Sequence, residues 1–367
     1  MNRSLNMLIL VLAVSLGVLW GLDRYHDSWV HQRRVRDSTH RLLGGTAIPL
    51  EQVTRMELSL PGSDSSWSFR RVDIGWRLPQ YRDAYAETAR VNAILGAVVE
   101  GRGTLVGHWP GDSAHYGVTE RDSMKVALFD RQDALVTTVW VGLVTPGKRS
   151  QESYMLVEGN DLIYHVDSNP WPPVSWTPGN AYPPLLDRRV IPGALNRRSV
   201  VSISFADRRS PGLQKILRKE LQPDPQAMIG PGTGPRYEWY GTLRDGTRKR
   251  LQDTPARSHV NRVLNLTFAE LLGSRMALTD ELQDPLVSMT LAYDGDMEDV
   301  LELCATGNPG KYTVYNVTTD QLFVVDEQTA AAFTPDLDFL LQGGDRAGLP
   351  IRSSSPAPAV FTPSVRM

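Results

Sequence analysis

Cysteine is almost missing from this chain of 367 residues, which has a single one, Cys304. One cysteine excludes an internal disulfide framework and any zinc site built from several cysteines. Cys304 lies in the alternating stretch LELCATG, which predicts a buried structural thiol on a strand.

The chain also has no excess of basic over acidic residues. The net charge is −2 and charged residues make up 22% of the chain. Nucleic-acid binders carry a basic surface, so we predict no nucleic-acid partner. Hydrophobic residues make up 41%, which is enough for a sizeable core.

Familiar catalytic and metal-binding motifs are also lacking. The seven histidines contain no His-Glu-x-x-His pair, no Gly-x-Ser-x-Gly is present, and GPGTGP lacks the lysine of a phosphate-binding loop. DGDMED (294–299) lacks the glycine and the final glutamate of a calcium loop and predicts a charged hairpin turn. We therefore predict no catalytic residue, no cofactor and no metal site.

One long apolar run is present, from Leu5 to Leu22. The cleavage site of a secretory signal follows small residues, whereas Leu19-Trp20-Gly21 near the end of this run do not form such a motif. Ala13-Val14-Ser15 could form one, but it leaves too short a hydrophobic stretch before it. About 18 residues is near the lower limit for a bilayer span. We predict a retained anchor, with a cleaved signal as the alternative. The residues predicted to contact the bilayer and its interface are Leu8, Leu12, Leu16, Leu19, Trp20, Tyr25 and Trp29.

The orientation of this anchor is argued from the flanking charges. Four arginines follow the run and one precedes it: Arg24, Arg33, Arg34 and Arg36 after it, Arg3 before it. By the positive-inside rule this places the body in the cytoplasm. Asp23 and Asp27 flank the run, however, and most of the arginines lie well beyond it. We therefore expect a single-pass protein of the bacterial inner membrane with its body on the extracytoplasmic (periplasmic) side, and the cytoplasmic side stays open.

An internal repeat is the strongest signal in the rest of the chain. Six segments recur in the same order, roughly one domain length of 150 to 165 residues apart. The first copy reads VTRMELSL (53–60), GWRL (75–78), ARVNAILGAVVE (89–100), SMKVALFD (123–130), TTVWVG (137–142) and SYMLVEGNDLIYHVD (153–167). The second copy reads SVVSISFA (199–206), EWYGTL (238–243), VNRVLNLTFAELLG (260–273), SMTLAYD (288–294), DVLELCATG (299–307) and KYTVYNVTTDQLFVVDE (311–327).

The periodicity within each copy predicts its elements. Apolar residues alternate with polar ones as in half-buried antiparallel strands, and 153–167 and 311–327 predict hairpins. One helix per copy shows an apolar stripe: Val91, Ile94, Leu95, Val98 and Val99, then Val260, Val263, Leu264, Phe268, Leu271 and Leu272. The predicted fold is α+β, a tandem duplication of a strand-rich antiparallel-sheet-plus-helix module after one transmembrane helix.

The domain boundaries follow from these patterns. We predict an anchor (1–30), a stalk (31–50), a first module (51–167), a Pro/aromatic-rich connector (168–198), a second module (199–342) and an extended Pro/Ser-rich tail (343–367), with 222–235 as a mobile loop. The prolines from Ser168 to Val190 favour an extended backbone. This connector is either a strap packed on the modules or a docking surface.

Candidate partner-binding residues come from the connector and the tail: Trp171, Trp176, Tyr182, Arg188, Arg189 and Phe361. For the run Asp187-Arg188-Arg189, an internal ion pair and an external contact are equally open. RDGTRKR (244–250) predicts a solvated hairpin tip, with lipid headgroups or an acidic partner as the alternative.

Several of these segments resemble one bacterial family of unknown function whose members have a single N-terminal anchor and an extracytoplasmic α+β body. The resemblance is carried by Trp76, Leu78, Tyr116, Gly117, Val118, Val141, Gly142, Tyr154, Tyr164 and Asp187-Arg188. It covers mainly residues 50 to 200, with a weaker echo to about 340. Members are often encoded beside ABC-type export or gliding-motility transport genes. The resemblance therefore implies a role beside a transporter and no catalysis.

Three functions follow as hypotheses. The first is a non-catalytic, membrane-anchored scaffold subunit that binds integral-membrane protein subunits, either of an ABC-type transporter or of a respiratory or photosynthetic energy-converting complex. The second is a cell-surface module for a small ligand or glycan, with Trp140, Trp171, Trp176 or Trp239 as stacking platforms. The third, an enzyme, has no set of catalytic residues to support it.

Overall fold

The computed structural model describes residues 39–43, 49–63, 66–142, 152–175, 177, 179–193, 200–207, 213–220, 237–274, 284–295 and 297–342. The predicted anchor, the loop at 222–235 and the tail at 343–367 lie outside these residues. Among the helices that are described, none is both long and apolar enough to cross a membrane.

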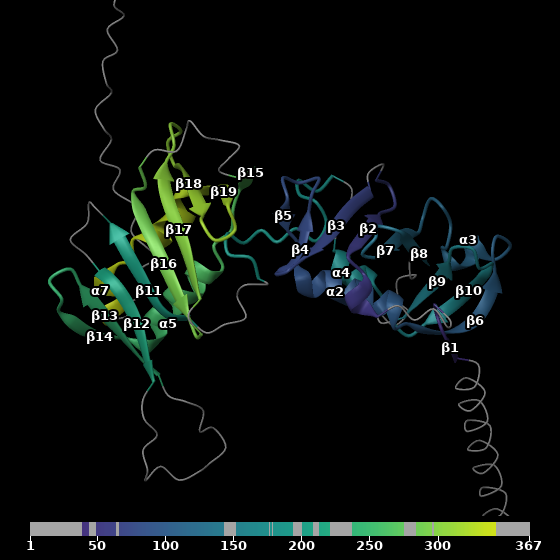
Figure 1. Cartoon of the computed structure of the whole chain (residues 1–367), viewed down its shortest axis with the longest axis horizontal. Helices are drawn as coiled ribbons and strands as arrows, with labels where there is room; N and C mark the ends of the chain where they lie inside the picture. The colour runs from purple at the N-terminus through teal and green to yellow at the C-terminus, as the bar shows by residue number, and fades with distance from the viewer. Residues whose placement is uncertain are drawn as a thin grey trace, which may run out of the picture. The chain divides into compact units, whose positions relative to one another are not determined.

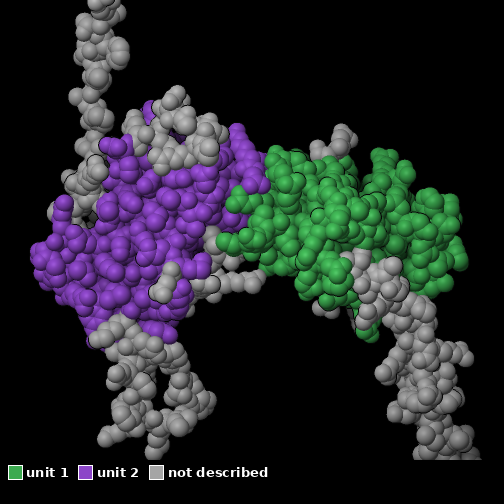
Figure 2. All heavy atoms as spheres, viewed as in Figure 1, with its two compact units in different colours: residues 1–80, 88–185 green, residues 81–87, 186–367 purple. Residues whose placement is uncertain are grey.

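The chain divides into two compact units (Figure 2). Unit 1 comprises residues 1–80 and 88–185, and unit 2 comprises residues 81–87 and 186–367. The division at Leu185/Leu186 falls inside the segment that the sequence marks as a connector.

The first half of the chain contains ten strands and three α-helices in its described part (Figure 1). The strands are β1 (Thr39–Arg41), β2 (Arg55–Ser59), β3 (Ser66–Val72), β4 (Gly75–Leu78), β5 (Ala84–Tyr85), β6 (Arg102–His108), β7 (Met124–Phe129), β8 (Leu135–Gly142), β9 (Ser153–Val157) and β10 (Leu162–Val166). The helices are α2 (Thr88–Val99), α3 (Ser113–Tyr116) and α4 (Trp171–Val174), with a 3-10 turn, η1, at Leu50–Gln52.

The second half contains nine described strands and three α-helices. The strands are β11 (Val200–Asp207), β12 (Leu213–Glu220), β13 (Tyr237–Leu243), β14 (Arg248–Leu251), β15 (Glu270–Gly273), β16 (Val287–Tyr293), β17 (Glu298–Ala305), β18 (Lys311–Asn316) and β19 (Gln321–Asp326). The helices are α5 (Asp253–Leu264), α6 (Glu327–Ala330) and α7 (Leu337–Gln342), with a 3-10 turn, η3, at Ala331–Phe333.

The two sheets have the same strand order, which confirms that the body consists of two repeated sheet modules. The first runs β1-β6-β10-β9-β8-β7-β2-β3-β4-β5, and the second, read from its far edge, runs β15-β19-β18-β17-β16-β11-β12-β13-β14. Every strand of the second sheet has a counterpart at the same place in the first, from β15 and β6 to β14 and β5. In chain order, α2 and α5 also occupy equivalent places, directly before β6 and β15.

The repeat extends further than the sequence indicates. In unit 1, β1 pairs antiparallel with the start of β6, and Leu42 N–H donates to Gly101 O at 2.9 Å. In unit 2, Arg189 pairs antiparallel with Thr267, and Val190 N–H donates to Leu266 O at 2.8 Å. Each module therefore begins with a short extended segment that lies along the chain just after the module's helix.

Alternation places the cores as predicted. Along β2, β7 and β8 one set of side chains is fully buried, including Met56, Leu58, Val126 and Val139, because every second residue of a strand faces the same side. The stripe of α2 is buried as well: Val91, Ile94, Leu95, Val98 and Val99. Cys304 on β17 is a buried thiol, as expected.

Three predictions about local structure were wrong. The second helix spans Asp253–Leu264 and not 260–273, so Phe268 and Leu271 are outside it and belong to the approach to β15 and to β15 itself. The connector is not extended throughout, since Trp171–Val174 forms a helical turn. Thr39–Arg41, placed by the sequence in a stalk, is a strand of the first sheet.

Candidate functional site

The residues that carry the family resemblance are used by the fold. Trp76 is buried on β4, and its indole N–H donates a hydrogen bond to Asn92 Oδ1 on α2 at 3.0 Å. The guanidinium of Arg71 lies 4.8 Å from the centre of the Trp76 ring, and burial lowers the pKa of Arg71. Leu78 is fully buried. This part of the pattern anchors α2 to the sheet.

The Tyr-Gly-Val part of the pattern closes the other end of unit 1. Gly117 ends α3 in the left-handed conformation, with φ of 65°, which suits glycine. Tyr116 donates its hydroxyl to Val106 O at 2.9 Å, and its ring lies 4.7 Å from that of Tyr154. A Cβ on Gly142 would lie 2.3 Å from Tyr116 O, so only glycine permits this approach.

Asp187 makes an internal ion pair with Arg189, which is one of the two alternatives predicted for the run Asp187-Arg188-Arg189. Its carboxylate is 3% exposed and accepts two hydrogen bonds from the Arg189 guanidinium, at 2.8 and 2.9 Å, and one from Gly193 N–H at 2.7 Å. The bond to Asp187 raises the pKa of Arg189. Arg188 is exposed and donates to Phe268 O at 2.9 Å. Both arginines thus make contacts within unit 2.

The other predicted partner-binding residues are spread over the chain. Trp171 is half-buried, and its indole N–H donates to Gly142 O at 3.1 Å, as expected of a strap packed on unit 1. Tyr182 is half-buried. Trp176, Phe361 and the membrane-contacting set (Leu8, Leu12, Leu16, Leu19, Trp20, Tyr25, Trp29) lie outside the described residues.

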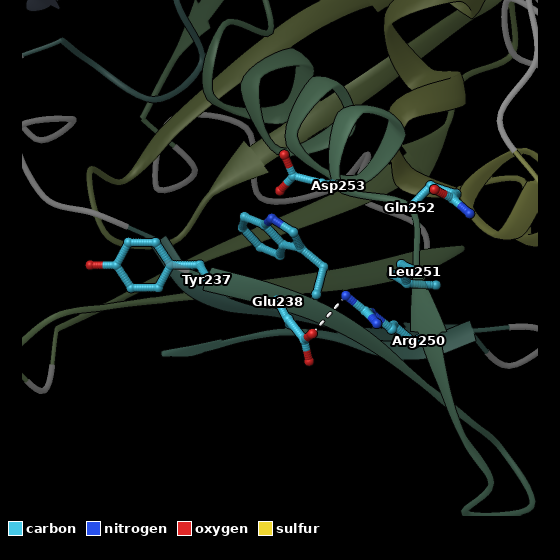
Figure 3. A pocket seen from close by; sticks show the side chains of 7 residues that line it. Tyr237, Glu238, Arg250, Leu251, Gln252 and Asp253 are labelled. Atoms are coloured by element: carbon cyan, nitrogen blue, oxygen red, sulfur yellow. Dashed lines mark ion pairs between the residues drawn. The ribbon is translucent and has the colours of Figure 1, made fainter. Parts of the chain in front are cut away.

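A hollow of about 400 Å³ opens where β13 begins and β14 ends (Figure 3). Its lining consists of Tyr237, Glu238, Trp239, Arg250, Leu251, Gln252 and Asp253. The register pairs Trp239 with Leu251, so these two apolar side chains share one face of the sheet. Glu238 and Arg250 point to the opposite face, where Figure 3 shows them joined by an ion pair.

The charged groups of this hollow are arranged around Glu238. Arg250 Nη2 lies 2.6 Å from Glu238 Oε1, and the Tyr240 hydroxyl donates to Glu238 Oε2 at 2.6 Å. That hydrogen bond to a carboxylate raises the pKa of Tyr240. Glu238 is shielded while Arg250 is 69% exposed, so the arginine presents most of its guanidinium to solvent.

Two tryptophans proposed as stacking platforms differ in their surroundings. Trp140 is 7% exposed, and its ring contacts Trp109, at 6.3 Å between centres, and the ammonium of Lys125, at 4.1 Å. Trp239 is 5% exposed and lines the hollow. The indole N–H groups of both tryptophans have no hydrogen-bond partner among the described residues. A buried indole N–H usually has one.

Beside the hollow lies a basic edge strand. β14 is the last strand of its sheet, and the side chains of Arg248, Lys249 and Arg250 are exposed. The turn before it, Arg244 to Gly246, is closed by Leu243 N–H donating to Thr247 O at 2.9 Å. Asp245 accepts from Thr247 N–H, which lowers the Asp245 pKa. The predicted hairpin tip is therefore confirmed, and its basic residues continue along β14, the edge strand of the sheet as described.

Two further buried titratable sites of unit 2 lie on α5 and β16. His259 on α5 is buried and neutral, because burial lowers its pKa to about 4. Tyr293 donates to the buried Asp299 at 2.7 Å, and burial together with this carboxylate raises the tyrosine pKa. The described residues contain no group of three or more histidine, cysteine or acidic side chains placed to hold a metal ion.

Comparison with known protein families shows to which family the chain belongs. The family described as Domain of unknown function (DUF4340) matches residues 76–272, more than half of the sequence. The chain belongs to this family. No curated protein and no solved structure matches it. The DUF4340 match begins at the Trp76 that starts the resemblance and ends inside β15, so it spans parts of both modules.

The sequence indicated parts of the hollow without joining them. Trp239 was a candidate platform and 244–250 a candidate basic contact, but Tyr237, Glu238 and Asp253 gave no signal of their own. The available signal was the hairpin itself: a turn at 244–246 implies that 239 faces 251 and that 240 faces 250.

Proposed function

We propose that this DUF4340 protein is a non-catalytic, membrane-anchored accessory subunit whose body binds a larger integral-membrane assembly. The observation that carries the proposal is the surface at β13 and β14, where an exposed basic strand at an open sheet edge adjoins a hollow lined by Trp239. Aromatic and arginine side chains beside a pocket are typical anchors of protein–protein contacts.

The anchor and the location belong to the same proposal. The apolar run from Leu5 to Leu22 holds the chain in the bacterial inner membrane, with the body on the extracytoplasmic side. The resemblance described above favours an ABC-type transporter as the assembly, and an energy-converting complex is the alternative.

The test is extraction of the native membrane in a mild detergent, followed by size analysis and mass spectrometry. We expect this chain to travel with integral-membrane subunits at a fixed ratio. Migration at the size of the chain alone would count against a subunit role. Protease added to intact spheroplasts should digest the body, and protection from the protease would place the body in the cytoplasm.

The hollow itself favours a second candidate, a module that binds a small polar ligand or glycan. Its volume, its aromatic lining and its paired charges suit such a ligand. Trp239→Phe, which keeps an aromatic ring but removes the indole and its N–H, separates the two functions. Loss of soluble-sugar binding with assembly intact supports the module, and loss of assembly supports the subunit.

A further inference from the structure

We infer that the outer edge of β14 takes up an acidic, extended segment of a partner protein as an additional strand of the second sheet. This inference rests on the proposed function, because it names the partner chemistry of the same surface. It commits to one occupant, an acidic strand of another protein.

The backbone direction along β14 supports this. Gln252 N–H points away from β13, since it donates to Leu340 O of α7 at 2.9 Å. Arg248 and Arg250 lie four and two positions before Gln252, and every second residue of an antiparallel strand directs its backbone N–H and C=O groups to the same side. Their backbone groups therefore face outward, toward the place of the next strand. Within the described residues, no strand occupies that place.

The length of the site is also defined. The turn that ends at Thr247 closes one end of the edge, and the contact of Gln252 with α7 closes the other. Between them lie three residues with exposed side chains, Arg248, Lys249 and Arg250. At about 3.3 Å per residue, a partner segment of three to five residues fills this edge.

The charge of β14 indicates which kind of strand can pair with it. Opposite charges directly across two strands attract and like charges repel, so this basic edge favours an acidic strand and disfavours a basic one. The chain's own tail from Gly343 is a poor occupant, since it contains Arg346, Arg352 and Arg366 against one acidic residue, Asp345. An acidic segment from another protein meets the requirement.

The pattern of that segment follows from the pleat. Arg248 and Arg250 share one face of the sheet with Glu238, whereas Lys249 shares the other face with Trp239 and Leu251. The matching strand therefore has acidic residues at alternate positions opposite the two arginines. An apolar residue between them reaches the face on which Trp239 lies and brings new surface to the hollow.

The experiment uses the full chain in detergent and a fluorescein-labelled peptide of alternating glutamate and valine, with a lysine–valine peptide as its control. Fluorescence anisotropy should give at least tenfold tighter binding for the acidic peptide, weakening as salt rises. N-methylation of one alternate set of its residues should abolish binding, and N-methylation of the other set should not, because only one set pairs with β14. Equal effects of the two sets would mean charge attraction without strand pairing and would overturn the inference.

A charge-reversed pair of variants provides the matched control. Arg248→Glu with Lys249→Glu should weaken peptide binding at least tenfold. Arg121→Glu with Arg131→Glu, an equal charge change at exposed positions of unit 1, should leave it unchanged. Self-association that depends on Arg248 and Lys249 would make the occupant a second copy and overturn the assignment to a partner. If both variants still migrate with membrane subunits, the accessory role is supported and its contact does not lie at β14, which overturns the inference. If the chain binds the acidic peptide but migrates alone, the β14 site is supported and the accessory role is not.

Discussion

At the scale of single residues, Asp187 is a buried carboxylate of unit 2 that is held by an ion pair with Arg189. Removing one partner of a buried ion pair typically costs 3–5 kcal/mol, and Arg189 is 31% exposed, so Asp187→Asn should lower the free energy of unfolding by about 3 kcal/mol. Urea unfolding of the detergent-solubilised chain measures this. The matched control is Asp133→Asn, which alters a pair whose carboxylate is 70% exposed and should change stability by less than about 0.5 kcal/mol. Equal effects of the two variants would contradict the assignment.

His259 makes stability depend on pH. Its pKa is about 4 in the folded chain against 6.5 for a free histidine, because burial and Arg262 disfavour the imidazolium. Between these values the unfolded chain binds the extra proton, so stability falls as the pH drops from about 6.5 to 4. The loss amounts to about 3 kcal/mol, the product of the difference in pKa and 1.36 kcal/mol per unit.

The measurement is urea unfolding at several pH values for the native chain and for His259→Leu. Subtracting the two curves removes the contribution of the other groups that titrate in this range. The variant should lose less stability than the native chain across this window. Parallel curves would show that His259 is not held neutral by its surroundings.

At the scale of elements, two glycines predict opposite effects of the same substitution. Gly142→Ala places a Cβ 2.3 Å from Tyr116 O, a backbone atom that cannot swing away, and should cost about 1–3 kcal/mol. Gly96→Ala, inside α2 with no atom within 4 Å of the added Cβ, should stabilise unit 1 by about 0.5–1 kcal/mol. Thermal unfolding of both variants checks the pair. A stable Gly142→Ala protein would mean that α3 does not pack closely on the end of β8.

The elements that the sequence predicted well are those whose burial is one-sided. Met56-Glu57-Leu58 alternates because one face of β2 is buried, and that pattern gave the strand. The polar strands β3 and β12, with Arg70, Arg71, Lys215 and Arg218, lack this contrast and were not predicted. β3 pairs with β2 and β4, and β12 pairs with β11 and β13, so their partners are the strands next to them in the chain. What the sequence lacks at these strands is the contrast between a buried and an exposed face.

The overlong second helix has a similar cause. Phe268 and Leu271 continue the spacing of Val260 and Val263, yet Leu271 is buried on a strand, and Phe268 stacks on Phe323 of β19, 4.9 Å between ring centres. Asn265 ends the helix, since a short polar side chain competes for backbone hydrogen bonds. A spacing of three or four residues is compatible with both arrangements when the apolar run is short.

At the scale of the whole molecule, the order of the repeated segments predicted two modules and the shared strand order confirms them. The candidate site was harder to predict, because its parts come from β13, β14 and the start of α5, and only pairing brings them together. Arg188 and Arg189, for which the sequence leaves an internal and an external contact equally open, make internal contacts because the segment that contains them repeats the role of β1.

Two modules with separate cores should open separately. Hydrogen exchange tests this with variants already defined, because a destabilised cooperative unit exchanges its amides faster while an independent one does not. Asp187→Asn should speed exchange in peptides from 186–342 and leave 88–142 unchanged, and Gly142→Ala should do the reverse. Peptides from Tyr81–Glu87 should follow Asp187→Asn, since Asp187 N–H donates to Tyr85 O at 3.0 Å. Faster exchange in both regions from either variant would mean that the chain opens as one unit.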